Sequence, residues 1–148
     1  MPGDKIPTTD TLLSRIFKTT SLDRFVRRYD DELNRVPPFS DYITNLARER
    51  GTAPERVIKK ADIVRTYGHQ LFNGTRKPTR DRVIQLAFGF GLSYEETQKL
   101  LTIARKSSLY PKIKRDAVII FALRNDYDIV AVNSALFDMQ IPILGEER

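Results

Sequence analysis

Residues 52–92 read TAPERVIKKADIVRTYGHQLFNGTRKPTRDRVIQLAFGFGL, and they predict the central helices of the chain. Apolar residues recur in it at the spacing of short amphipathic helices. The pattern predicts one helix from Pro54, a second over residues 64–73 that Gly74 ends, and a third after the loop that follows. A turn of about three residues at 61–63 joins the first two helices, which is typical of a helix-turn-helix.

Residues that start and stop helices support this division. Thr52 and Glu55 have the spacing of a capping box, with a proline inside the first turn. Thr79 is expected to cap the third helix, and Gly89 and Gly91 are expected to break it. Each of the three helices is therefore expected to be short.

One further helix is expected on each side of this stretch, so that residues 38–107 hold five helices. The apolar residues of the earlier helix are Phe39, Ile43, Leu46 and Ala47. Gly51 is expected to end it. The later helix begins at a second capping box, Ser93–Glu96.

The two ends of the chain are expected to be helical as well. Residues 1–37 form an N-terminal arm of two helices, the second of which follows Ser21 and ends before Pro37. Residues 108–148 form a two-helix extension that packs on the core or on a partner subunit. The apolar residues of these four helices are Leu12, Leu13, Ile16 and Phe17; Leu22, Phe25, Val26, Tyr29 and Leu33; Ile113, Ala117, Ile120 and Phe121; and Ile129, Val132, Leu136 and Phe137. Val118–Phe121 also has the composition of a strand, but no segment offers it a partner, so we predict an all-α chain.

The composition excludes several classes of protein. The chain of 148 residues has no cysteine, which rules out disulfides, cysteine-bound zinc and thiol catalysis. His69 is the only histidine, and the densest acidic cluster, Asp30–Glu32, lies beside two arginines. We therefore expect neither an enzyme nor a metal or cofactor site. No apolar run is long enough to cross a bilayer and no secretory signal is present, so we expect a cytoplasmic protein.

Positive charge is concentrated in the middle of the chain. The net charge is +6, and residues 38–107 carry 13 basic and 7 acidic residues. Residues 1–37 hold 7 and 6, and residues 108–148 hold 5 and 6, so the ends contribute no net charge. The basic residues between 56 and 82 are Arg56, Lys59, Lys60, Arg65, Arg76, Lys77, Arg80 and Arg82. Such a segment is typical of a surface that binds a polyanion, although a solvated basic face has the same composition.

Taken in order, these features resemble the Xre-type, lambda-repressor-like family of bacterial and phage DNA-binding domains. The resemblance covers residues 39–104 and rests on Val57, Ile58, Ala61, Ile63, Leu71, the loop 72–78, and Val83, Ile84, Leu86, Ala87, Phe90, Gly91 and Leu92. It implies a five-helix DNA-binding domain whose helix 64–73 is a recognition helix in the major groove of double-stranded DNA. Because such domains usually act as dimers, it also implies a homodimer.

The resemblance places base contacts on Arg65, Thr66 and Gln70, with His69 close by. The chemistry of two of these residues fits the role independently, because a guanidinium can donate to both acceptors of guanine and a carboxamide can pair with adenine. Phosphate contacts are implied for the loop after the helix and for its neighbours. These residues are Tyr67, Asn73, Thr75, Arg76, Lys77 and Arg80.

The sequence departs from the family pattern at several positions. Gly68 stands where an apolar residue usually packs on the preceding helix. Tyr67 is expected either to fill that space or to turn its hydroxyl to the DNA backbone. Val64 replaces a capping side chain, Asp62 replaces a glycine of the turn, and Phe72 replaces an acidic residue and is expected in the core.

Two functions are consistent with these observations. The first is that of a sequence-specific double-stranded DNA-binding transcriptional regulator, which occludes a promoter or contacts polymerase. The second is that of an antitoxin-like or adaptor protein-interaction module, which keeps the helix-turn-helix as a scaffold and binds a protein through its N- or C-terminal helices. RNA stays open as a ligand, because charge alone does not separate the two nucleic acids.

Overall fold

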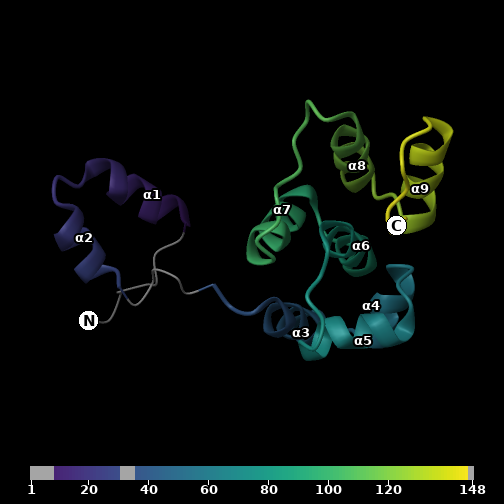
Figure 1. The fold of residues 1–148 in the computed structure, drawn as a ribbon, viewed down its shortest axis with the longest axis horizontal. Coiled ribbons are helices and arrows are strands. Elements are labelled where there is room, and N and C mark those ends of the chain that lie inside the picture. Colours follow the sequence, from purple (N-terminus) through teal and green to yellow (C-terminus); the bar gives the residue numbers. More distant parts are fainter. Residues whose placement is uncertain (1–8, 31–35, 147–148) are drawn as a thin grey trace. The chain divides into compact units, whose positions relative to one another are not determined.

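The computed structural model describes residues 9–30 and 36–146. Within these ranges every regular element is an α-helix, so the prediction of an all-α chain is confirmed for them (Figure 1). The chain divides into two compact units, Met1–Val36 and Pro37–Arg148. None of the described helices combines the length and the apolar content that a membrane-spanning helix needs.

The first unit contains α1 (Thr9–Lys18) and α2 (Leu22–Arg28). Ser21 caps α2, as predicted, by accepting a hydrogen bond from the Arg24 N–H at 3.3 Å. Nη1 of Arg15 donates to the hydroxyl of Tyr29 at 2.6 Å and so joins the end of α2 to α1.

The apolar stripe predicted for α2 is only partly buried. Phe25 and Tyr29 are buried and their rings lie 4.9 Å apart, whereas Leu22 and Val26 are exposed. The last member of the predicted stripe, Leu33, lies outside the described residues, as do the last two residues of the acidic cluster. α1 buries none of its residues.

In its described part, the second unit contains seven helices around one core. They are α3 (Phe39–Glu49), α4 (Pro54–Lys60), α5 (Arg65–Asn73), α6 (Arg80–Phe90), α7 (Tyr94–Ile103), α8 (Lys114–Arg124) and α9 (Ile129–Asp138). α6 runs through the middle of this unit (Figure 1), where it packs on α4, α7 and α9, and residues 83–90 are all buried. The core continues into the C-terminal helices through Ile119, Ala122 and Leu136.

Most helix ends in this unit follow the expected residues. Left-handed glycines stand at the ends of α3, α5 and α6; they are Gly51, Gly74 and Gly91. Ser93 and Glu96 form the predicted capping box of α7. The side chain of Thr79 accepts a hydrogen bond from the Arg82 N–H and caps α6.

The capping box predicted for α4 is wrong. α4 begins at Pro54 with Ala53 as its N-cap, and no side-chain hydrogen bond caps it. The carboxylate of Glu55 instead accepts a hydrogen bond from Arg65 of α5. The acidic residue that the pattern assigned to helix capping therefore acts between two helices.

Gly89 does not break α6, contrary to the prediction. It lies inside the helix, one residue before the last. A Cβ atom there would lie 2.5 Å from the carbonyl oxygen of Val57 and 2.9 Å from Cβ of Ala61. Gly89 thus allows α6 to approach the backbone of α4, and the helix ends only at Gly91.

The apolar face predicted for α8 is only partly correct. Ile120 of that face is partly buried against the core. The buried residues of α8 are Asp116, Ile119, Ala122 and Leu123. Ile113 and Phe121 of the predicted face are exposed instead, Phe121 by 56%. The physical reason is an ion pair, because Arg80 of α6 binds the buried carboxylate of Asp116 and turns that side of α8 toward the core.

α9 buries most of its predicted face. Ile129, Val132 and Leu136 are buried, but Phe137 is 75% exposed. The α8 segment whose composition suits a strand is helical.

Candidate nucleic-acid interface

α5 packs on α4 at Gly68, where the two helices come very close. A Cβ atom at Gly68 would lie 2.4 Å from Cγ2 of Ile58, so only glycine fits there without a shift. Leu71 and Phe72 complete the buried side of α5. Ile58 therefore fills the space beside Gly68, and the expectation that Tyr67 fills it is wrong.

A buried side chain of α6 fixes the turn between α4 and α5. Asp62 has a φ of 57°, the left-handed conformation that glycine adopts most easily. Nε2 of Gln85 donates to the carbonyl oxygens of Ala61 at 3.2 Å and of Asp62 at 3.4 Å. Sequence reasoning missed Gln85, although a lone polar residue inside a buried apolar run was the available signal.

The four predicted base-contact residues lie away from the buried side of α5. Arg65 and Thr66 are exposed, and the side chain of Arg65 is 79% accessible. His69 and Gln70 are partly exposed one turn further along. No side chain caps α5, whose N-cap is Val64, so the helix begins one residue later than predicted. The helical spacing thus brings these four residues to one side of the unit.

Glu55 of α4 holds two of these residues. Nη2 of Arg65 donates to Oε1 of Glu55 at 2.5 Å, and Nε2 of His69 lies 3.3 Å from the same oxygen. The hydrogen bond from Arg65 and its positive charge lower the pKa of Glu55 below its ordinary value, with a smaller effect of His69. Sequence reasoning did not foresee this carboxylate among the candidate DNA contacts.

Tyr67 lies between two arginines rather than free at the surface. The guanidinium of Arg76 stands 4.5 Å from the centre of the Tyr67 ring, and that of Arg82 stands 4.8 Å from it. Nε of Arg76 also donates to the side-chain oxygen of Gln70 at 3.1 Å. The ring therefore orients Arg76 beside α5, and Gln70 keeps its amide nitrogen for other partners.

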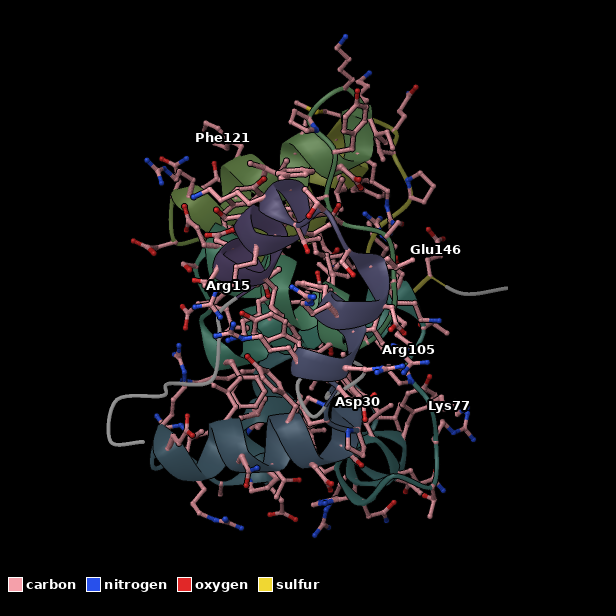
Figure 2. The ribbon with its side chains drawn as sticks, turned by 90° about the vertical axis from the view of Figure 1, so that its left-hand side faces the viewer. Arg15, Asp30, Lys77, Arg105, Phe121 and Glu146 are labelled. Atoms are coloured by element: carbon pink, nitrogen blue, oxygen red, sulfur yellow. The ribbon has the colours of Figure 1, made fainter. Side chains whose placement is uncertain are left out.

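The loop between α5 and α6 is ordered by its own polar groups. Oδ1 of Asn73 accepts hydrogen bonds from the N–H and the hydroxyl of Thr75, at 2.9 and 2.7 Å. Pro78 is buried, whereas Lys77 extends away from the loop (Figure 2). Lys77 is thus open to an incoming ligand.

Arg80 does not fit the role of a phosphate contact. Its Nη atoms donate to both carboxylate oxygens of Asp116, at 3.1 and 2.9 Å. Its Nε donates to the carbonyl of Ser107, and Nη2 donates to that of Ser108 as well. Because these contacts occupy the guanidinium, we withdraw Arg80 from the predicted phosphate contacts.

The basic residues of the segment 56–82 have different surroundings. Arg80 and Arg82 make contacts inside the unit. Arg56, Lys59 and Lys60 line a groove with residues 126–130, and no residue of α5 lines that groove. The exposed cations beside α5 are Arg65, Arg76 and Lys77. The sequence thus located the positive charge, but it did not show which of these cations make contacts inside the unit and which line a groove.

No cluster of three metal-binding side chains occurs among residues 9–30 and 36–146. Comparison with protein-family models, with curated proteins and with solved structures finds no match to this chain. We therefore infer a function from the chemistry of the α5 surface.

Proposed function

We propose that the protein is a sequence-specific double-stranded DNA-binding transcriptional regulator of the Xre-type, lambda-repressor-like kind, which reads the major groove with α5. The observation that carries the proposal is the division of α5 into two sides. Gly68, Leu71 and Phe72 are buried against the unit, while Arg65 and Thr66 face solvent. A helix anchored on one side and polar on the other is suited to insertion into the major groove.

Base recognition in this proposal comes from a small set of donors. Arg65 offers a fork of N–H groups that matches the two acceptors of guanine. Gln70 offers an amide N–H₂ whose oxygen is held by Arg76, which presets the orientation of the amide. Thr66 and His69 flank these two residues and contact neighbouring bases or the DNA backbone.

Phosphate contacts come from the loop that follows α5. Lys77 reaches outward, and Arg76 is fixed on the ring of Tyr67, so both charges are available to the DNA backbone. Tyr67, Asn73 and Thr75 support this loop and supply further hydrogen-bonding groups. Such contacts set affinity and register without reading sequence. The bound protein then occludes a promoter or contacts polymerase, and two copies on a two-fold axis read two half-sites.

The test is to select duplexes from a random pool and to measure binding of variants to the selected site. We expect Arg65→Ala and Gln70→Ala each to weaken binding by about 5- to 150-fold, the cost of one lost base contact of roughly 1–3 kcal/mol. Arg124→Ala is the matched control, because Arg124 is an equally exposed arginine next to a carboxylate, that of Glu95. Binding of both α5 variants with the affinity of the unchanged protein would refute the proposal.

A second candidate function is the antitoxin-like or adaptor module. It is favoured by the exposed apolar residues of the first unit, among which Phe17 and Leu22 are the most accessible. A stable complex with a protein partner that is lost in Phe17→Ser and Leu22→Ser, together with no retardation of any selected duplex, would favour this function over DNA binding.

A further inference from the structure

A groove of about 740 Å³ separates α4 from the connection between α8 and α9. α4 contributes three cations to one wall: Arg56, Lys59 and Lys60. They lie at the spacing that places side chains on one face of a helix. The opposite wall carries Asp126, Tyr127 and Asp128, and the end of α6 forms the floor. The groove therefore has a basic wall and an acidic wall.

The charges of the two walls do not neutralise each other across the groove. Among the described residues, no ion pair within 4.0 Å involves the three cations of α4 or the two carboxylates. Asp128 caps α9 by accepting a hydrogen bond from the Ala131 N–H at 2.8 Å, and Asp126 is exposed. A protein surface that presents carboxylates to α4 and cations to the 126–128 connection is therefore complementary in charge to this one.

An exposed apolar strip adjoins the two walls. Val130 is 69% exposed and lines both this groove and a second groove of about 400 Å³. Phe137 is 75% exposed and lies two helical turns further along α9, on the same face as Val130. Single exposed apolar residues are ordinary on protein surfaces. Here the two residues form a strip beside walls of opposite charge.

We propose that this surface binds a second copy of the chain, across a two-fold axis that passes near Val130. Under two-fold symmetry the basic wall of each copy meets the acidic wall of its partner. A surface whose two halves carry opposite charge is therefore complementary to itself. Val130 and Phe137 then form the apolar centre of the interface, and the charges form its rim. The inference rests on the homodimer of the proposed function and assigns the face that builds it.

This arrangement leaves the candidate DNA-binding residues accessible. Neither groove is lined by any residue of α5. Arg65 and Thr66 therefore stay outside the interface, and both copies of α5 are free to contact a duplex. Self-association and DNA binding are thus separable by mutation.

The test uses two variants of full-length protein that change the charge of one wall at a time. Lys59→Glu/Lys60→Glu reverses two of the three charges of the basic wall and leaves Arg56. Asp126→Lys/Asp128→Asn replaces the acidic wall, and asparagine at 128 keeps the helix cap. Lysine is tolerable at 126, whose φ is 55°, because Arg105 and Gln140 adopt the same left-handed conformation in this chain.

Sedimentation over a dilution series is expected to give a dimer for the unchanged chain and a monomer for each variant alone. An equimolar mixture of the two variants is expected to give a dimer again, because the mainly acidic surface of one variant then meets the basic surface of the other. Val130→Glu is expected to be monomeric as well. Lys99→Glu/Lys106→Glu, which makes the same change in charge at two exposed residues outside both grooves, is expected to remain dimeric.

Three results would overturn the inference: a monomeric unchanged chain, variants that dimerise alone, or a mixture that stays monomeric. Circular dichroism identifies any variant that is unfolded, and Val130→Glu then provides an independent disruption of the same face. Failure of the proposed DNA binding is visible separately, because Arg65→Ala is expected to remain dimeric whether or not the protein binds DNA.

Discussion

Arg80 of α6 and Asp116 of α8 form a two-pronged ion pair in which each Nη atom donates to its own carboxylate oxygen, at 3.1 and 2.9 Å. The carboxylate is almost fully buried, with 2% of the side chain exposed. Its Oδ2 also accepts the backbone N–H of Tyr110 at 3.0 Å. The pair therefore joins α6, the segment before α8 and α8 itself.

A second ion pair joins the same two helices, with its arginine on α8 and its aspartate on α6. Nη1 and Nη2 of Arg115 donate to the carboxylate oxygens of Asp81, at 2.8 and 2.9 Å. Two Arg-Asp dipeptides, 80–81 and 115–116, thus bind each other reciprocally. Arg115 also donates to the carbonyl oxygens of Pro142 and Ile143, so the C-terminal segment is attached at the same point.

We expect Arg80→Ala to lower the free energy of unfolding by about 3–5 kcal/mol, because it leaves the buried carboxylate of Asp116 without its partner. Urea titration measures this loss. Arg124→Ala, which removes an exposed pair with Glu95 at 3.9 Å, is the control and should cost less than about 1 kcal/mol. Equal effects of the two substitutions would show that the buried pair does not hold the C-terminal helices.

Asp81 makes stability depend on pH. Burial raises its pKa, but hydrogen bonds from Arg115 and the backbone of Gly145, with the charge of Arg115, outweigh burial and bring the pKa below the ordinary 3.8. The folded state therefore favours the carboxylate. Its contribution is complete above the ordinary pKa and is lost as the pH falls through the lowered value in the folded state. We expect Asp81→Asn to be less stable than the unchanged protein at neutral pH, and the difference to shrink as urea titrations approach pH 3. A difference that stays constant with pH would contradict this linkage.

The sequence predicted the helices whose ends have strong signals. α5 and α6 are bounded by Gly74, Thr79 and Gly91, residues whose backbone or capping preferences are local properties. The rotation of α8 was not predictable in this way. Its apolar residues suggest one face, but the ion pair between Arg80 and Asp116 selects the neighbouring one, and that partner lies 36 residues away in sequence.

The candidate site shows the same limit. Helical spacing alone places Arg65, Thr66, His69 and Gln70 on one side of α5, so that grouping was foreseen. Glu55 was assigned to a capping box because its position fits one, and its contact with Arg65 depends on how α4 and α5 cross. Contacts between elements, rather than preferences within them, decide such residues.

Gly68→Ala tests how closely α5 approaches α4. The added methyl group would overlap Ile58, so we expect a loss of about 1–3 kcal/mol in the free energy of unfolding, the usual cost of overpacking. Ile58→Ala removes the overlapping atoms and should be less harmful in the Gly68→Ala background than alone. Thr66→Ala, a substitution to alanine at an exposed position of the same helix, is the control and should cost little. Strict additivity of the Gly68 and Ile58 effects would mean that α5 and α4 are not in close contact at this point.

Glu55→Gln tests how the carboxylate beside Arg65 affects DNA binding. The substitution keeps the size of the side chain and removes a negative charge from the surface that would face DNA phosphates. We therefore expect tighter binding to an unselected duplex, by up to about fivefold, the range of one exposed ion pair. We also expect poorer discrimination between selected and unselected duplexes, because Arg65 loses the partner that orients its guanidinium.

Fluorescence anisotropy with both duplexes measures the affinity for an unselected duplex and the discrimination between the two duplexes. Glu95→Gln removes the carboxylate of the exposed Arg124 pair and should change neither. Unchanged affinity together with unchanged discrimination in Glu55→Gln would show that Arg65 does not meet DNA at this surface.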